Sequence, residues 1–208
     1  MMKEEHPPRR VVLAVSGASG AIYAVRCLQM LVSAKVHVDL VYSGAAKRVL
    51  FEECNICFEE GDDIIALLGD PLAQQFVTVH KHGDIGATIA SGSALGEAVI
   101  VLPCSLSTLA GISNGSAANL IERSAQVALK EQRKLIIVPR ETPLSRTHLD
   151  HMSRLAWAGA TIMPASPGFY HCPQSIEELV DHLCAKILGV CGIKQTSVAP
   201  WTGCVLDE

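Results

Sequence analysis

The segment VVLAVSGASGAIY, residues 11–23, decides the fold that we expect for this chain. Five apolar residues, 11–15, stop at a run of small residues, 16–21, and a helix-like pattern continues to about Ser33. This order predicts a buried parallel strand, a tight loop and a helix start. Glycines let a backbone approach a ligand, and the unpaired first amides of a helix attract anions. The loop is therefore either a phosphate site or a close helix–sheet contact.

Two common nucleotide-binding motifs do not fit this loop. A dinucleotide fingerprint, GxGxxG, needs glycine where Ser19 stands and an acidic residue at the end of the next strand, where Ser43 stands. Asp39 lies within that strand rather than at its end. A Walker A loop needs Gly-Lys-Ser/Thr, which the sequence lacks.

Length and composition limit the class of protein. The chain has 208 residues, 49% hydrophobic and 18% charged, and predicts one α/β domain with terminal extensions at 1–10 and 193–208. So few charges predict apolar surface covered by further copies of the chain, a homo-oligomer. A net charge of −4 argues against nucleic acid as a partner. We find no signal peptide and no apolar run of bilayer length, which predicts a cytoplasmic protein without membrane contact.

Apolar runs and helical patterns alternate along the chain. Strands are expected at 11–15, 36–42, 76–79, 98–102, 135–138 and 161–163. Helices are expected at 21–33, 45–53, 62–68, 105–112, 117–132, 144–158 and 176–188, the last one starting after Ser175 and ending at Gly189. This alternation predicts a doubly wound, mostly parallel sheet with helices on both faces, a Rossmann-like arrangement.

Polar residues follow most of the expected strands. In such a sheet, ligands bind outside the carboxyl ends of the strands. Hydroxyls and small residues come there after the first, second, fourth and sixth strands, and Arg140 with Glu141 follows the fifth. Hydroxyls suit a phosphate, Arg140 adds a planar cation, and Glu141 is the best candidate for proton transfer.

Each of these residues also has a purely structural interpretation. Ser43, Ser105 and Ser175 fit the N-caps of helices. Arg140 and Glu141 fit a surface pair, although the prolines around them favour a rigid functional loop.

Three further charged residues lie on expected helices. Arg123 and Lys130 are seven residues apart and share one helix face, for which solvent contact is the simplest interpretation. Glu53 stands at a helix end, where the dipole disfavours a carboxylate, so a specific partner is expected.

Cysteines and histidines give no metal motif. Cys54 and Cys57 form one CxxC pair, but no second pair follows at zinc-site spacing. The eight cysteines, these two included, lie mostly in apolar segments and are expected to be reduced core thiols. Surface positions are expected for His80, His82, His148 and His151.

Taken together, five segments resemble the UbiX-like flavin prenyltransferases. They are SGASGAIYAVRCLQML (16–31), ASGS (90–93), LPCSLSTLAGI (102–112), NLIERSAQVALKEQRKLIIVPRETPLS (119–145) and PASPGFYHCPQS (164–175). The resemblance covers residues 11–201 in the order of the family, and PRETPL with GFYHxPQS is its most specific part.

The resemblance implies an activity. Such enzymes bind reduced FMN and transfer a dimethylallyl group from dimethylallyl monophosphate to flavin N5, and a second bond to C6 closes a new ring. No metal takes part. The prenylated FMN goes to UbiD-type decarboxylases, for example in ubiquinone biosynthesis or aromatic acid decarboxylation. The family assembles as a homododecamer with sites between subunits.

The resemblance also implies roles for individual residues. Flavin contacts are implied for Gly17, Ala18, Ser19, Ser43, Ser105, Leu106, Ser107, Thr108 and Arg140. Glu141 resembles the acid that protonates the leaving phosphate, and Glu53 acts near the flavin with Ser19. The donor phosphate is held by Tyr170 and Lys186, with Arg123 and Lys130 from a neighbouring subunit, while Trp201 helps to close the site. Some relatives have arginine where Lys186 stands, and lysine offers a point charge instead of a bidentate fork.

Three other functions stay possible at this stage. A phosphopantothenoylcysteine-type decarboxylase needs a histidine near its first helix, where this chain has Tyr23 and Val25. A direct phenylacrylate decarboxylase would need a site for an aromatic acid, which is not evident. An FMN carrier would not need the leaving-group residues Glu141, Arg123 and Lys130.

Overall fold

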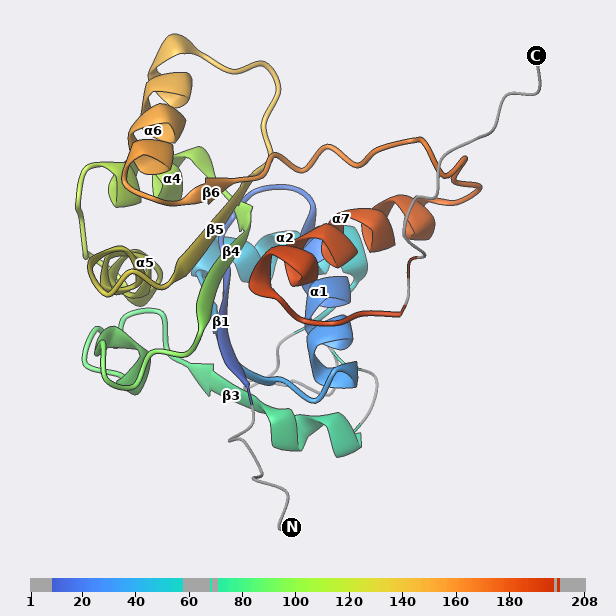
Figure 1. The fold of residues 1–208 in the computed structure, drawn as a ribbon, viewed down its shortest axis with the longest axis horizontal. Coiled ribbons are helices and arrows are strands. Elements are labelled where there is room, and N and C mark those ends of the chain that lie inside the picture. Colours follow the sequence, from blue (N-terminus) through green and yellow to red (C-terminus); the bar gives the residue numbers. More distant parts are fainter. Residues whose placement is uncertain (1–8, 58–67, 69–70, 197, 199–208) are drawn as a thin grey trace.

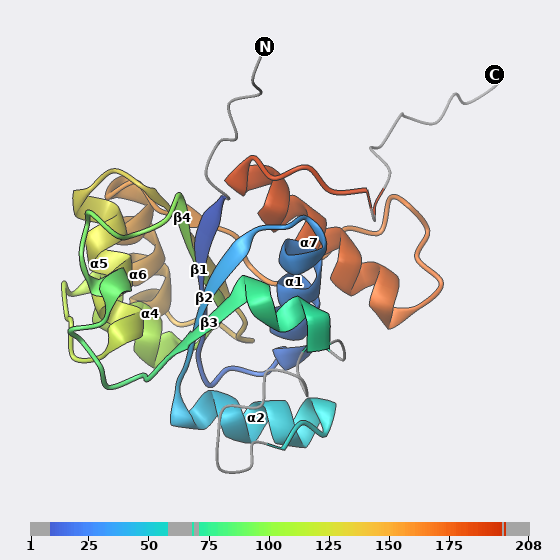
Figure 2. The same ribbon diagram turned by 90° about the horizontal axis from the view of Figure 1, so that it is seen from below.

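A computed structural model describes residues 9–57, 68, 71–196 and 198. Within this part of the chain, six parallel strands form one sheet in the order β3-β2-β1-β4-β5-β6 (Figures 1 and 2). They are β1 (Arg10–Val15), β2 (His37–Tyr42), β3 (Val77–His80), β4 (Ala98–Cys104), β5 (Lys134–Pro139) and β6 (Thr161–Ile162). The chain reverses its direction of winding between β1 and β4, as in a doubly wound sheet.

Helices cover both faces of the sheet. One layer contains α1 (Ala21–Ser33), α2 (Gly44–Cys54) and α7 (Ile176–Cys191), and the other contains α4 (Leu106–Ser113), α5 (Leu120–Lys130) and α6 (Arg146–Trp157) (Figure 1). Two short 3-10 segments are η1 (Pro71–Phe76) and η2 (Thr88–Ala90). No helix in the described residues combines the length and the apolar character that crossing a membrane requires.

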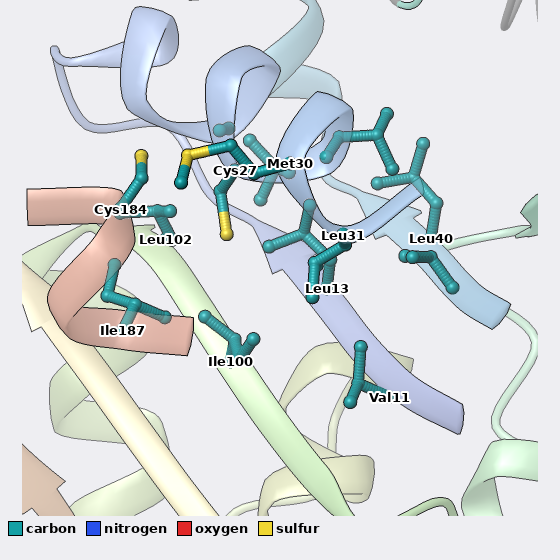
Figure 3. Close-up of a cluster of buried hydrophobic side chains, with 14 of the residues drawn as sticks. Val11, Leu13, Cys27, Met30, Leu31, Leu40, Ile100, Leu102, Cys184 and Ile187 are labelled. Atoms are coloured by element: carbon teal, nitrogen blue, oxygen red, sulfur yellow. The ribbon is translucent and has the colours of Figure 1, made fainter. Parts of the chain in front are cut away.

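The core divides along the sheet because side chains alternate between the faces of a strand. In β1, Val11 and Leu13 join the cluster under α1 and α7, whereas Val12 and Ala14 join the cluster under α4, α5 and α6. Figure 3 shows the first cluster, where Cys27 of α1 and Cys184 of α7 lie above the strands. Strands buried on both faces need continuous apolar sequence, which is the pattern at residues 11–15.

The expected fold is confirmed, with element boundaries that move by up to three residues. The predicted helix at 117–132 begins later because Asn119 caps it, accepting a hydrogen bond from Glu122 N. The predicted helix at 144–158 likewise begins after Ser145. Apart from Leu68, the predicted helix at 62–68 lies outside the described residues.

The sequence predicts that the last helix ends at Gly189, and this is wrong. The helix continues to Cys191 and ends at Gly192, whose φ of +74° suits glycine. Arg9 donates to the carbonyls of Cys191 (3.0 Å) and Gly192 (2.5 Å). Lys134 donates to the carbonyl of Val190 (2.9 Å). These two cations stabilise the negative end of the helix.

The terminal boundaries also differ from expectation. Arg10 already belongs to β1, although the sequence assigns it to an extension. Ile193, assigned to the other extension, is buried in the core. The compact unit therefore reaches beyond residues 11–192 at both ends.

Asp39 is a fully buried carboxylate in the middle of β2. Arg10 binds both of its oxygens, with 2.6 Å from Nη2 to Oδ1, and His80 Nε2 lies 2.7 Å from Oδ1. The histidine side chain is only 11% exposed, so the prediction of a surface position for His80 is wrong. Two partners thus offset the cost of burying this charge.

We expect Asp39→Asn to lower the free energy of unfolding by about 3 kcal/mol, because it leaves Arg10 without its buried counter-charge. Urea unfolding at fixed protein concentration measures this loss. Glu97→Gln is the matched control, since the Arg9–Glu97 pair is 40% and 46% exposed and should contribute less than about 1 kcal/mol. Equal effects of the two substitutions would contradict a structural role for the buried pair.

Candidate active site

The ends of β1 and β4 are joined by one buried serine at the reversal point of the sheet. Ser16 donates to the Pro103 carbonyl from both N (3.2 Å) and Oγ (2.8 Å), and its Oγ accepts from Ser105 N (2.6 Å). Ser43 N donates to the carbonyl of Val15 at 3.0 Å. These bonds bring the loop after β1, the start of α2 and the start of α4 together at the carboxyl edge.

The loop after β1 packs directly on the start of α2. A Cβ added to Gly17 would overlap the Cβ of Ala45, so this close approach requires glycine. Ala18 is buried, and Ser19 is exposed. A close contact is thus present at Gly17, but it joins the loop to α2 and is not the helix–sheet contact that we expected. The exposed Ser19 lies at the carboxyl edge, where ligands bind in this fold.

Glu53 binds the N-terminus of α1. Its Oε2 accepts hydrogen bonds from Gly20 N and Ala21 N, each at 2.8 Å. The expectation that the first amides of this helix are unpaired is therefore wrong, because a carboxylate of the protein fills the anion position. The specific partner expected for Glu53 is the positive end of α1, which compensates for its position near the end of α2.

Charged and polar groups around Glu53 keep it ionised. Partial burial raises the pKa of this carboxyl, but hydrogen bonds from Ser19, Gly20 and Ala21 and the nearby Arg140 cation together lower the pKa below its ordinary value. Arg140 also donates from Nε to the Ser19 carbonyl at 2.9 Å. The loop is thus held from two sides, by α2 and by the end of β5.

Hydroxyls gather at the start of α4. Ser105 Oγ accepts from Thr108 N and lies 3.1 Å from Ser107 Oγ and 3.0 Å from Thr108 Oγ1. Leu106, the first residue of the helix, is half-buried beside them. The N-cap interpretation is confirmed for Ser105, and equally for Ser43 and Ser175, which accept amide hydrogens in the same way. Capping does not prevent the exposed Ser107 hydroxyl from meeting a ligand at the positive end of this helix.

The Arg140–Glu141 loop lies at the same edge. Glu141 is exposed, and its Oε1 accepts from Thr142 N at 3.0 Å. Arg140 points back to the loop after β1, so the two residues do not form a surface ion pair with each other in this structure. The carboxylate is open to a ligand next to a fixed guanidinium.

The described cysteines are all free thiols. Cys27, Cys104, Cys184 and Cys191 are buried, as expected of core thiols, while Cys57 and Cys172 are exposed, contrary to that expectation. Burial raises the pKa of Cys191 to about 11. Within the described ranges, no three potential ligands among His, Cys, Asp and Glu gather as a metal site.

Comparison with known proteins matches this architecture to one family. The Flavoprotein family profile matches residues 1–188. The flavin prenyltransferase UbiX of Pseudomonas aeruginosa is 43% identical over 206 residues, covering 93% of this chain and 94% of the relative. The flavin prenyltransferase LpdB of Lactiplantibacillus plantarum is 43% identical over 196 residues, covering 94% and 99%.

The chain belongs to the UbiX-like flavin prenyltransferases. Solved structures of this family agree with the fold. AnUbiX (PadA1) in complex with FMN and dimethylallyl pyrophosphate has a TM-score of 0.84 at 36% identity and covers 95% of this chain and 99% of that one. A dodecameric FMN-dependent UbiX-like decarboxylase from Escherichia coli O157:H7 has a TM-score of 0.81 at 37% identity, covering 94% and 100%.

Not all of the residues implied by the UbiX-like family meet within one protomer. Tyr170 is 82% exposed in the loop before α7, and Lys186 is exposed on α7 itself. Arg123 and Lys130 lie on α5, which covers the opposite face of the sheet (Figures 1 and 2), and Lys130 pairs with Glu131. Trp201 lies outside the described residues.

One residue beside the expected donor site has no signal in the sequence. His182 of α7 accepts a hydrogen bond at Nδ1 from Gly168 N (3.3 Å) and stacks on His171. The sequence shows only that His182 lies four residues before Lys186, a spacing that places both residues on one face of the helix.

We expect Gly17→Ala to weaken FMN binding and to lower stability by about 1–3 kcal/mol, because the added Cβ forces the loop away from α2. Fluorescence titration with FMN and thermal unfolding measure the two effects. Gly44→Ala is the matched control, because a Cβ there meets no atom within 4 Å. If both variants bind FMN like the wild type, the close approach at Gly17 does not shape the flavin site.

The lowered pKa of Glu53 predicts a pH dependence of stability. A depressed carboxyl pKa adds stability above its ordinary value of 4.5, and this stability is lost as the pH falls through the folded-state value. Glu53→Gln should therefore lower the free energy of unfolding by about 0.5–1 kcal/mol at pH 7. Below pH 5, the free energy of unfolding should decline less steeply in this variant than in the wild type. Glu52→Gln, one residue away in an exposed pair with Arg48, should keep the wild-type profile. A wild-type profile for Glu53→Gln would rule out the helix-end contact as a source of stability.

Proposed function

We propose that this protein transfers a dimethylallyl group from dimethylallyl monophosphate to N5 and C6 of reduced FMN, without a metal ion, and releases prenylated FMN. The observation that carries the proposal is the arrangement at the carboxyl edge. There the loop 17–20 is held by Glu53 and Arg140, and the hydroxyls of α4 and the carboxylate of Glu141 lie open beside it. Membership of the UbiX-like family supports the same reaction.

The FMN phosphate fits the start of α4 better than the start of α1. Glu53 already binds the amides of α1, and its negative charge would repel a phosphate there. At α4, the hydroxyls of Ser107 and Thr108 stand at the positive end of the helix. Gly17, Ala18 and Ser19 would then hold the flavin ring, with Ser43 and Arg140 as further contacts.

The remaining groups act on the donor phosphate and on protons. Reduced flavin supplies the nucleophilic nitrogen and carbon when it is bound. Glu141 donates a proton to the departing phosphate, and Lys186 with Tyr170 holds that phosphate, so that its growing negative charge meets a cation rather than a metal ion. The Ser19–Glu53 hydrogen bond gives a route for a proton beside the flavin. The site must exclude water, which would otherwise capture the allylic cation.

The complete site requires a second subunit. Arg123 and Lys130 lie in the α4–α5–α6 layer, away from Tyr170 and Lys186, so a neighbouring copy must supply them. Large apolar side chains are exposed on the single protomer and suit contact with further copies: Phe51, Ile85, Leu144, Leu149, Trp157, Phe169 and Ile176. Together with the dodecameric E. coli relative, this supports a homododecamer in which Trp201 helps to close each site.

The product determines the partner. Prenylated FMN is a cofactor for another enzyme, and we propose a UbiD-type decarboxylase as its recipient, in ubiquinone biosynthesis or aromatic acid decarboxylation. Both steps would take place in the cytoplasm.

The direct test is the mass of the flavin after anaerobic incubation of the purified protein with reduced FMN and dimethylallyl monophosphate. We expect a flavin heavier by one dimethylallyl unit, and a parallel reaction with the diphosphate shows which donor is preferred. Bound but unmodified FMN with both donors would overturn the proposal and favour an FMN carrier. Carbon dioxide released from a phenylacrylic acid without any added decarboxylase would instead favour direct decarboxylation.

We expect Glu141→Gln to slow formation of the prenylated flavin at least about 100-fold while FMN affinity stays unchanged, because the amide cannot protonate the leaving phosphate. Single-turnover kinetics and FMN titration separate the two effects. Glu177→Gln, an exposed substitution of the same kind in the first turn of α7, should leave both unchanged. Loss of FMN binding in Glu141→Gln with normal turnover of the bound fraction would contradict the role of Glu141.

A further inference from the structure

The turn formed by residues 168–174, just before α7, is fastened to α7 by side chains spaced four residues apart. Glu178, His182 and Lys186 follow one another along one face of the helix. Glu178 Oε2 accepts from Gln174 N at 2.7 Å, at the end of the turn. His182 Nδ1 accepts from Gly168 N at 3.3 Å, at its beginning. The turn is thus held at both ends, and the next residue on that face is the proposed phosphate ligand.

His182 makes a second contact with the same turn. The rings of His171 and His182 stack with their centroids 4.8 Å apart and their planes within 12°. A Cβ added to Gly168 would lie 3.2 Å from His182 Cε1 and 3.4 Å from Tyr170 Cδ2, so Gly168 lies close to both rings. His182 therefore holds the residues on both sides of the segment that contains Tyr170.

We propose that His182 is a positioning residue for the donor phosphate, which fixes the Tyr170 segment through Gly168 and His171 relative to Lys186, one turn further along α7. This inference rests on the proposed function, because it assigns the phosphate of the prenyl donor to Tyr170 and Lys186. His182 itself does not touch the donor. Without it, the turn that carries Tyr170 loses its contacts at Gly168 and His171, and the donor must order this part of the turn as it binds.

The hydrogen bond defines the protonation state of His182. A backbone N–H can only donate, so Nδ1 must be unprotonated, and the ring hydrogen lies on Nε2. Burial lowers the pKa of His182 below its ordinary value of 6.5, and the cationic forms of His171 and Lys186 lower the pKa further. Two neighbouring carboxylates on α7 already have partners: Glu178 accepts from Gln174 N, and Asp181 pairs with Arg26 of α1.

The direction of the pH effect follows from this state. The neutral ring holds the turn at neutral pH, and the hydrogen bond is lost as the pH falls through the lowered pKa, when Nδ1 gains a proton. The apparent KM for the donor should therefore rise as the pH falls below 6.5, whereas the affinity for FMN should not fall in parallel.

Two substitutions distinguish the role of the Nδ1 hydrogen-bond acceptor from the role of the His182 ring. His182→Phe keeps a flat ring against His171 but loses the acceptor, whereas His182→Asn keeps an oxygen near the position of Nδ1 and cannot titrate. In the full-length enzyme at pH 7.5, we expect His182→Phe to raise the KM for dimethylallyl monophosphate about tenfold with little change in kcat. At pH 7.5, the KM of His182→Asn should stay within about threefold of the wild-type KM. At acid pH, its KM should rise less than that of the wild type, and the remaining rise comes from protonation of the donor phosphate. A wild-type KM and pH profile for His182→Phe, or equal losses of FMN and donor binding, would overturn the proposal.

Hydrogen exchange gives a second readout that does not depend on turnover. Mass spectrometry of peptides covering residues 166–174 should show faster exchange in His182→Phe than in the wild type or in His182→Asn, with no change in peptides from β1 or α4. Unchanged exchange in His182→Phe would overturn the anchoring of the turn. A wild-type enzyme that makes no prenylated flavin would instead overturn the proposed function, and the exchange result would still decide whether His182 holds the turn.

Discussion

The carboxylate of Glu53 on the first amides of α1 is the contact on which the candidate site depends. It ties the end of α2 to the loop after β1, and Arg140 ties the same loop to the end of β5. The loop can therefore approach α2 closely at Gly17 and still present Ser19 to solvent. Because the helix end already binds a carboxylate, we place the ligand phosphate at another helix end of this edge, the start of α4.

The doubly wound sheet explains why the proposed active site needs more than one chain. Its carboxyl edge brings together the loop after β1, the hydroxyls of α4 and the Arg140–Glu141 loop. The two helical layers, however, keep the cations of α5 on the opposite face from Tyr170 and Lys186. In the assembly that we propose, further copies would resolve this separation and would also cover the exposed apolar side chains of α6, including the 90% exposed Trp157.

The features that could be predicted from the sequence are those with a local period or a local rule. A continuous apolar run at residues 11–15 predicts a buried strand, because both faces of that strand are covered. The caps Ser43, Ser105 and Ser175 can be predicted because an N-cap depends only on the few residues at the start of its helix. The contacts that were missed join distant residues. The hydrogen bonds Glu53–Gly20, Asp39–His80 and His182–Gly168 each join residues that are far apart in the sequence. No periodic pattern in the sequence predicts such pairs. The exact end of α7 was missed for the same reason, since Arg9 stabilises it from the other end of the chain.

A crystal structure of the assembled protein with FMN would test the central claim most directly. Our account predicts that Glu53 still binds the amides of Gly20 and Ala21, and that the FMN phosphate lies at the start of α4 within hydrogen-bonding distance of Ser107 or Thr108. A phosphate bound to the amides of α1, with Glu53 displaced, would contradict it.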